Sequence, residues 1–416
     1  MRLIRSRDLW GRLTPVLCLL LALTWTLGVG VLNASIAQAA PTVANDARLA
    51  GDQQRTRFIA DLSEKVDVHV FSLDNPYRVI VDLADVQFQM PPGIGEKPKG
   101  LIKGYRYGLF APGKSRIVID VASPFLVDKT FVLDARDGQP ARLVIDLVPT
   151  DRKTFLKSTE AAAAETAPPP VRPLPAPKER PANAKPIIVL DPGHGGIDSG
   201  AVSKKGTEEK DVVLAFTELL KARLEKTEKF QVELTREGDR FLTLRDRVAF
   251  AHEKGASLFL SIHADFFPHK GEARGATIFT LSETASDAEA RALAAKENLA
   301  DAVGGYELPQ EPDEILANIL IDLAQRETQN RSVVFASSIL STLEGRVKLH
   351  SRKPKSAGFM VLKSPDVPSV LLELGYLSDE QDEKLLLSED WRKKTAQAVA
   401  QAVESYFERR IARTPF

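Results

Sequence analysis

Hydrophobic and polar positions follow two different patterns along this chain, and the change comes near residue 150. Between residues 42 and 149, short β-branched runs alternate with turn residues, without the spacing of an amphipathic helix. Three runs share one order (an arginine, three apolar residues, an aspartate, a further apolar residue), and they are Arg78–Leu83, Arg116–Val121 and Arg142–Leu147. The other expected strands are Arg57–Leu62, Val66–Phe71, Leu101–Tyr107 and Lys129–Leu133. This region therefore predicts a small all-β sandwich.

Beyond residue 186, short apolar strands alternate with amphipathic helices. The expected strands are Ile187–Leu190, Gln231–Thr235, Ser257–Ile262, Ala276–Leu281, Gly358–Leu362 and Ser369–Leu374. The expected helices are Glu208–Lys226, Leu244–Lys254 and Trp391–Phe407, with a long helical stretch from about Ser286 to Leu343. This alternation predicts an α/β fold, with a mostly parallel sheet covered by helices.

A segment rich in alanine and proline separates the two patterns. It runs from Asp151 to about Lys185 and contains Ala161–Ala164, Pro168–Pro170 and four further prolines. Such a composition cannot bury enough apolar surface to fold alone, so we expect an extended, partly polyproline linker. The resulting divisions of the chain are residues 1–39, 42–150, 151–185 and 186–411.

The first 39 residues are organised as an export signal. A basic start is followed by an apolar run, Val16–Leu32, and by the small-residue pattern Ala37-Gln38-Ala39. A single uncleaved membrane anchor is the alternative. With cleavage, the mature protein has no permanent membrane span and loses Cys18, the one cysteine of the chain. It would then use neither a disulfide nor a thiolate ligand.

The charge balance excludes one broad class of function. The chain contains 56 basic and 56 acidic residues, so its formal net charge at pH 7 is zero. Proteins that bind nucleic acid through their overall charge have an excess of basic residues. We therefore expect no nucleic-acid partner.

Three polar motifs follow predicted strands of the second region. They are Asp191-Pro-Gly-His-Gly-Gly196, Ser261-Ile-His-Ala-Asp265 and Val370-Leu-Leu-Glu-Leu374. Ligands of parallel α/β sheets bind at the carboxyl ends of the strands, so His194, His263 and Glu373 are expected to lie close together. Two histidines and a carboxylate can form a three-ligand zinc site with one open position, and a further carboxylate can act as its general base.

Glu209 is the expected third ligand. The apolar stripe of the first helix runs through Val213, Phe216 and Leu220, and one turn further back it reaches Glu209. An acid on the buried edge of a helix is costly unless it is paired or bound to a metal. The alternative is an ordinary acid in the first turn, stabilised by the helix dipole. The two histidines nearby favour the metal ligand.

With Gly206-Thr-Glu-Glu-Lys210 at the helix start, these motifs resemble the zinc-dependent N-acetylmuramoyl-L-alanine amidases of bacterial cell-wall turnover. The resemblance covers about residues 186–411, and four motifs in this order are highly specific. The β-rich region before the linker resembles the AMIN domain that targets such amidases to peptidoglycan. One departure is mild: leucine and glycine surround Glu373 where more polar or aromatic residues would be expected.

The resemblance implies a function and a site. His194, Glu209 and His263 would hold Zn²⁺, and Glu373 would be catalytic. The bond cleaved would join the lactyl carbonyl of N-acetylmuramic acid to the L-alanine nitrogen of the stem peptide, during cell-wall turnover and daughter-cell separation. The protein would be a periplasmic monomer that acts on peptidoglycan and responds to a LytM-type activator protein.

Two alternatives belong to other functional classes. A peptidoglycan-binding protein with an inactive amidase domain is the first, and the loss of any of the four site residues would have favoured it. All four are present. A zinc deacetylase or peptidase of another fold is the second, and the chain lacks its helical H-E-x-x-H motif.

Two further candidates lie in a basic loop near the last strands. His350 precedes Ser351-Arg352-Lys353, in a loop that could reach the strand-end site. We interpret His350 and Arg352 as candidate residues that bind substrate or support the metal ligands.

A long insert separates the strands Ala276–Leu281 and Gly358–Leu362. Its length of about 75 residues exceeds what a crossover helix needs. Near residues 304–330 an acidic segment with Glu311, Asp313 and Glu314 precedes an apolar helical run. An ordinary core helix is one interpretation. The family resemblance implies another, autoinhibition, in which a carboxylate occupies the open position of the zinc. Glu314 is then the first candidate.

Overall fold

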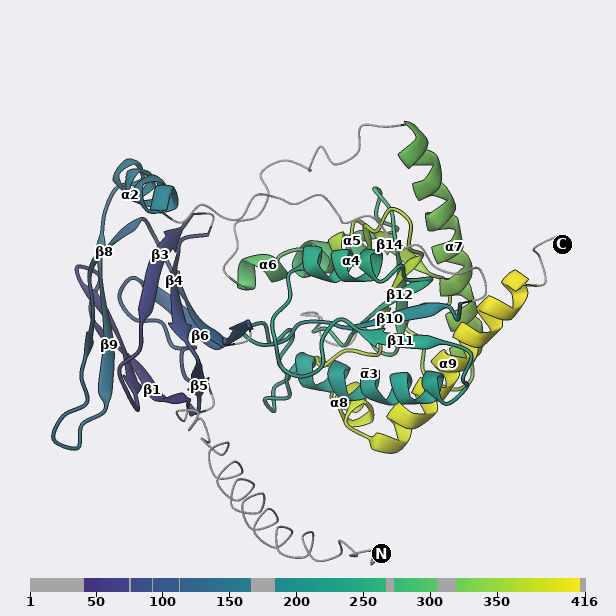
Figure 1. Cartoon of the computed structure of the whole chain (residues 1–416), viewed down its shortest axis with the longest axis horizontal. Coiled ribbons are helices and arrows are strands. Elements are labelled where there is room, and N and C mark those ends of the chain that lie inside the picture. The colour runs from purple at the N-terminus through teal and green to yellow at the C-terminus, as the bar shows by residue number, and fades with distance from the viewer. Residues whose placement is uncertain are drawn as a thin grey trace, which may run out of the picture. The chain divides into compact units, whose positions relative to one another are not determined.

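The computed structural model describes residues 41–165 except 75, 92 and 112, together with residues 184–266, 273–304 and 319–411. These ranges contain both predicted domains (Figure 1). The export signal, most of the linker, and Glu311, Asp313 and Glu314 lie outside them.

The first domain is the predicted all-β sandwich. One sheet has the strand order β5-β1-β2-β9-β8 and the other has the order β3-β4-β7-β6. The first sheet is built from β1 (Thr42–Gly51), β2 (Thr56–Leu62), β5 (Val86–Phe88), β8 (Phe125–Leu133) and β9 (Ala141–Pro149). The second contains β3 (Val68–Leu73), β4 (Arg78–Ala84), β6 (Ile102–Ala111) and β7 (Lys114–Val121). The sequence pattern did not predict β1, which is polar and alanine-rich, or β5, which has three residues, and both depend on pairing with their neighbours.

The repeated arginine–aspartate pattern of this domain forms ion pairs between neighbouring strands. Arg116 is opposite Asp82, and its guanidinium donates two hydrogen bonds to that carboxylate, at 2.5 and 2.8 Å. Arg57 of β2 donates to Asp146 of β9 in the same two-pronged way, at 2.6 and 2.8 Å. Apolar residues between the charged ones fill the core. The pattern therefore has a structural explanation in cross-strand pairing.

The prediction of an extended linker is wrong for its first part. Residues Arg152–Glu165 form helix α2. The ring of Phe155 is fully buried and packs on Tyr77 and Phe125, with ring centroids 5.0 and 5.2 Å apart. Asp151 accepts hydrogen bonds from the backbone and hydroxyl of Thr154, and so begins the helix. Packing on the sandwich stabilises a helix that the composition alone does not predict.

The second domain contains a six-stranded sheet with the order β11-β10-β12-β15-β13-β14. Its strands are β10 (Ile187–Pro192), β11 (Gln231–Leu234), β12 (Leu258–His263), β13 (Thr277–Leu281), β14 (Lys355–Ala357) and β15 (Ser369–Glu373). The first four strands in that order are parallel, while β13 is antiparallel to β15. The prediction of a mostly parallel sheet is confirmed. The strand predicted at Gly358–Leu362 is wrong, because the edge strand is β14 and Met360–Leu362 is a 3-10 turn.

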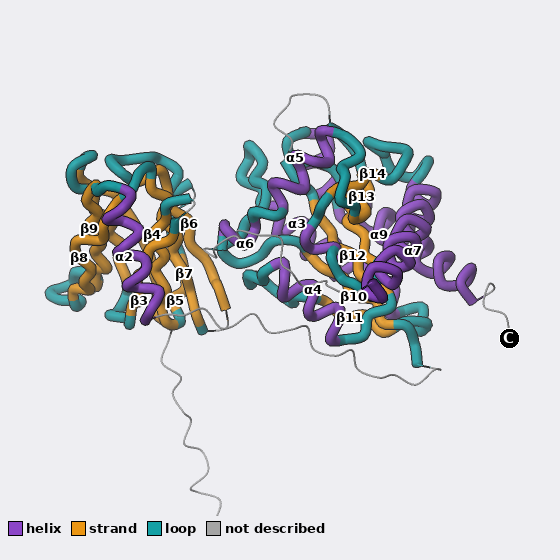
Figure 2. Tube along the Cα trace, turned by 90° about the horizontal axis from the view of Figure 1, so that it is seen from above, coloured by secondary structure: helices purple, strands orange, loops and turns teal. Residues whose placement is uncertain are grey.

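Helices cover both faces of this sheet, as Figures 1 and 2 show. On one face, α3 (Glu209–Glu225), α7 (Ile319–Leu343) and α9 (Glu389–Ile411) share an apolar core with the strands. On the other, α4 (Leu244–Glu253) and α5 (Ala288–Glu297) share a second core. The short helices are α6 (Ala300–Val303) and α8 (Glu380–Leu386). Within the described ranges, no helix combines the length and the apolar character needed to cross a membrane.

The strand register brings the three polar motifs to one edge. Pro192 at the end of β10 is opposite Ile262 of β12, and His263 is opposite Glu373 of β15. All three strands point the same way, so the segments that follow them meet at their carboxyl ends.

Candidate metal centre

His194 lies in a tight turn after β10, on a strained backbone. Its φ is +58°, in the left-handed region that non-glycine residues seldom adopt. Two glycines leave room for the His194 and His263 rings. A Cβ on Gly193 would lie 2.4 Å from the His263 ring, and one on Gly200 would lie 2.6 Å from the His194 ring. The glycines of the motif therefore permit the close approach of the two imidazoles.

Three predicted ligands converge. Glu209 Oε1 lies 3.3 Å from His194 Nε2 and 3.2 Å from His263 Nδ1. The Glu209 carboxylate is held in place by backbone N–H groups, because Ala264 donates to Oε1 and Ala201 donates to Oε2, each at 2.8 Å. Its position at the start of α3, on the buried side, agrees with the sequence prediction.

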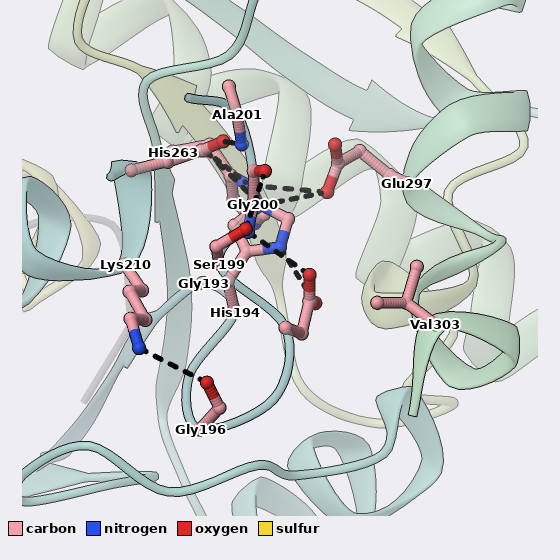
Figure 3. A network of polar contacts seen from close by, with 12 residues as sticks. Gly193, His194, Gly196, Ser199, Gly200, Ala201, Lys210, His263, Glu297 and Val303 are labelled. Carbon is pink, nitrogen blue, oxygen red and sulfur yellow. Dashed lines mark hydrogen bonds and ion pairs between the residues drawn. The ribbon is translucent and has the colours of Figure 1, made fainter. Parts of the chain in front are cut away.

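A fourth residue, Glu297, completes the group. It is the last residue of α5, and its Oε2 lies 3.5 Å from His194 Nε2 and 3.3 Å from His263 Nδ1. Figure 3 shows its carboxylate directed at both histidines. Sequence reasoning did not identify Glu297, because it considered acids of the insert near residues 304–330 and not those of this helix. The available signal was the one used for Glu209, because Glu297 continues the buried stripe of Ala290, Leu293 and Ala294.

The spacing of these atoms fits a tetrahedral zinc ion. Ligands about 2.0 Å from such an ion lie about 3.3 Å apart. The four nitrogen–oxygen distances are 3.2, 3.3, 3.3 and 3.5 Å. His194 Nε2 and His263 Nδ1 are buried and have no hydrogen-bond partner among the described residues. The donor set and its geometry therefore suit Zn²⁺.

Asp198 orients the first histidine. His194 Nδ1 lies 2.8 Å from Asp198 Oδ2, and both side chains are buried. A carboxylate only accepts, so Nδ1 has the proton and Nε2 presents its lone pair to the other ligands. A carboxylate behind a histidine is a common support of metal sites, because it sets the tautomer and the ring orientation.

The charges of the site favour a bound cation. Burial alone would lower the pKa of His194, but the carboxylates of Asp198, Glu209 and Glu297 raise this pKa well above its usual value. Burial would raise the pKa of Glu209, and the two histidines instead hold it well below its usual value. Several acids thus surround two imidazoles, and a proton or a metal ion must balance them.

Glu373 lies beside this group at the end of β15. Its Oε2 accepts a hydrogen bond from the Asp265 backbone N–H at 3.1 Å, while Oε1 has no partner among the described residues. Burial first, and then the charges of Glu209 and Glu297, raise the pKa of Glu373 well above its usual value. Such a carboxylate is a stronger base than an exposed one, which suits proton transfer near neutral pH.

Comparison with known proteins identifies the family. Residues 188–405 match the family described as N-acetylmuramoyl-L-alanine amidase, and residues 46–147 match the AMIN domain. The chain is 33% identical to the amidase AmiC of Escherichia coli O6:H1 over 364 residues, 85% of this chain and 86% of the relative. It is 33% identical to AmiC of Neisseria meningitidis over 380 residues, 86% of this chain and 89% of the relative. AmiA of Escherichia coli K12 is 44% identical over 232 residues, 56% of this chain and 79% of the relative.

The chain belongs to this amidase family. The predicted resemblance is thereby confirmed, and so is the fold class, an AMIN domain followed by an α/β amidase domain.

Hydrogen bonds from Arg247 connect the turn that contains His194 to strand β10. Its guanidinium donates to Asp191 Oδ1 at 2.7 Å and to the His194 carbonyl at 2.8 Å. Thr235 and Ser261 donate their hydroxyls to the same Asp191 carboxylate. Both carboxylate oxygens of Asp191 therefore accept hydrogen bonds within the fold. Asp191 stabilises the strained turn, and His194 is the residue of this motif that can bind a metal.

The two loop candidates lie in the segment before β14. His350 Nε2 is 2.9 Å from Glu289 Oε1 of α5, and the His350 ring is 5.8 Å from the Tyr376 ring, centroid to centroid. Arg352 is exposed. Neither belongs to the group of converging ligand atoms, and their role in binding substrate or supporting the metal ligands stays a prediction.

Proposed function

We propose that the amidase domain hydrolyses the amide bond between N-acetylmuramic acid and the L-alanine of the peptidoglycan stem peptide, with Zn²⁺ as cofactor. The observation that supports this most directly is the convergence of His194 Nε2, Glu209 Oε1 and His263 Nδ1 at zinc-ligand spacing beside Glu373. The amidase relatives and the match over residues 188–405 supply the substrate class.

Each residue of the site has a defined task. His194, Glu209 and His263 would hold the zinc, which when bound polarises a carbonyl and makes a water molecule more acidic. Glu373 accepts the proton of the attacking water. It then returns this proton to the nitrogen of the departing L-alanine, because an amine is a poor leaving group unless it is protonated. Asp198 keeps the His194 ring in the productive orientation.

The position of Glu297 supports an autoinhibited state. His194, Glu209 and His263 would hold the zinc, and Glu297 Oε2, within 3.5 Å of both histidine nitrogens, could be a further ligand. A carboxylate bound there would exclude the attacking water. Activation therefore requires α5 to move, which is the step we assign to a LytM-type activator. The contribution of Glu311, Asp313 and Glu314 stays a prediction.

Polar contacts hold α5 and α6 on the domain, and we call these residues, 288–303, the lid. Lys296 pairs with Asp265, two residues beyond His263. Asn298 donates to the Gly358 carbonyl at 2.9 Å and accepts from the Met360 N–H at 2.8 Å. Asp301 accepts from the Leu244 N–H at 2.8 Å. Such contacts can be exchanged for water when the lid leaves, while Ala290, Leu293 and Ala294 of α5 are buried in the second core, so lifting the lid also exposes apolar surface.

The remaining parts of the chain have targeting roles in this proposal. The AMIN domain would bind peptidoglycan or a feature of the division septum, and the first 39 residues would export the protein to the periplasm, where it acts as a monomer. Among the residues that the structure describes, the group of metal-binding side chains that stands out lies in the amidase domain. This supports an AMIN domain without a part in bond cleavage.

Mass spectrometry of muropeptides tests the proposed reaction. Purified sacculi are digested with Glu297→Ala, which removes the inhibitory carboxylate, and with Glu297→Ala/Glu373→Ala. The first variant should release intact stem peptides, while the second should release none and still contain zinc. Zinc-loaded, folded Glu297→Ala protein that binds sacculi without releasing peptide would favour the alternative, a peptidoglycan-binding protein without turnover.

A further inference from the structure

The lid has a second acid that faces two basic side chains of the amidase domain. Glu289, in the first turn of α5, lies 2.9 Å from His350 Nε2 through Oε1 and 2.5 Å from Lys355 Nζ through Oε2. These side chains are largely covered, with exposed fractions of 22% for Glu289, 17% for His350 and 13% for Lys355. Glu289 therefore sits in a prepared site for a carboxylate.

Helix capping does not require this contact. Asp287 is the N-cap of α5 and accepts a hydrogen bond from the Ala290 N–H at 2.8 Å. Lys355 and His350 belong to β14 and to the loop before it, outside the lid. Lifting the lid would remove Glu289 from both side chains, and Asp287, which lies 3.4 Å from Lys355 Nζ, is the acid beside them that precedes the lid. Without Glu289, the Lys355 ammonium and the His350 ring have donor positions open to a new carboxylate.

A chain of side-chain contacts connects this pair to Glu373. Thr277 of β13 is opposite Glu373 in the sheet, and its hydroxyl is 3.0 Å from the hydroxyl of Tyr376. The Tyr376 ring in turn contacts the His350 ring, with centroids 5.8 Å apart. Thr277 and Tyr376 are themselves buried, so these contacts place His350 close to the Glu373 site through the interior of the domain.

The two acids of the lid have a spacing that a peptide can reproduce. Glu289 and Glu297 are eight residues apart on one helix, which corresponds to about 12 Å along its axis. An extended peptide covers about 3.3–3.6 Å per residue, so between three and four residues span this length. One acid lies at the metal centre and the other lies between Lys355 and His350.

We propose that Lys355 and His350 form a subsite for a carboxylate of the acidic stem peptide, about three residues beyond the scissile amide. The closed lid imitates the substrate at both ends: Glu297 takes the reacting position and Glu289 takes the carboxylate subsite. Lifting the lid thus exposes the two positions together. This inference rests on the proposed amidase function and names a substrate feature that the reaction selects.

Kinetics with two matched substrates test the subsite. The substrates are a muramoyl tripeptide with a free carboxylate on its third residue and the same compound with a carboxamide there. All proteins are full-length and contain Glu297→Ala, and any remaining change in lid opening acts on both substrates alike, so the ratio of their KM values reports the subsite. Lys355→Met should raise KM roughly tenfold or more for the carboxylate compound, as expected for loss of a charge-assisted hydrogen bond. It should leave the carboxamide compound unchanged.

Two further variants make the result decisive. Lys353→Met removes an exposed lysine from the same loop and should alter neither KM. His350→Gln should repeat the selective loss, and it keeps the test possible if Lys355→Met fails to fold. With Glu373→Gln added to stop turnover, calorimetric Kd values should show the same preference for the carboxylate compound.

Two outcomes are distinguishable. Equal effects on both substrates, or an unchanged KM for the carboxylate compound in both subsite variants, would overturn the subsite and leave Glu289 as a clasp of the lid. A folded, zinc-loaded Glu297→Ala parent that hydrolyses neither compound would count against the proposed function itself.

Discussion

Removal of the Glu297 carboxylate should activate the enzyme without an activator. Glu297 is 4% exposed, and its Oε2 lies within 3.5 Å of the two histidine nitrogens. One buried, charge-assisted contact contributes about 1.5–3 kcal/mol. At about 1.4 kcal/mol per factor of ten, Glu297→Ala shifts the closed–open equilibrium roughly 10- to 150-fold toward the open lid. Basal hydrolysis rises by the same factor while the open form is the minor one.

The same substitution should change the pH profile. Burial raises the pKa of Glu373, and the negative charge of Glu297 raises it further. Glu373 must be ionised to accept a proton from water, so activity falls as the pH drops through this pKa. Without the Glu297 charge the pKa of Glu373 is lower. The acid limb of kcat/KM should therefore move to lower pH in Glu297→Ala.

Dye release from labelled sacculi, without activator, measures both effects. Arg291→Ala is a matched control, because it removes an exposed charged side chain from the same helix and should leave basal activity unchanged. Zinc content should stay near one ion per chain in Glu297→Ala, since His194, Glu209 and His263 remain. A basal rate within about twofold of the unaltered protein, in a folded and zinc-loaded variant, would refute the inhibitory role of Glu297.

Three further changes probe other parts of the molecule. His194→Ala should abolish zinc binding and hydrolysis, while circular dichroism still shows the folded AMIN sandwich; full zinc occupancy would exclude this ligand. Asp198→Asn should weaken zinc affinity roughly 10- to 100-fold in a chelator competition, because the orientation of His194 is lost. Phe155→Ala should lower the unfolding free energy of the AMIN domain by about 3–5 kcal/mol in urea, and a change below about 1 kcal/mol would show that α2 is not part of that core.

The four site residues could be predicted from the sequence because their positions follow from strand ends and helical spacing. His194, His263 and Glu373 lie at or just after the carboxyl ends of apolar strands, and parallel strands bring those ends to one edge. Glu209 was visible from the helical spacing of its apolar neighbours. The structure brings these side chains together, and their roles as ligands and base stay predictions for the zinc and activity measurements.

Glu297, the clasp at Glu289 and the helix α2 required the tertiary structure. The spacing of α5 puts Glu297 in line with Ala290, Leu293 and Ala294, while the docking of this helix also depends on Lys296 at Asp265 and on Asn298 at residues 358–360. Helix α2 is stabilised because Phe155 packs on Tyr77 and Phe125 of the sandwich. Periodicity along the sequence identifies elements and their buried faces, because both follow from backbone geometry. The docking of one element on another depends on contacts between residues far apart in the chain, so only the folded molecule shows that an acid of α5 reaches the metal centre.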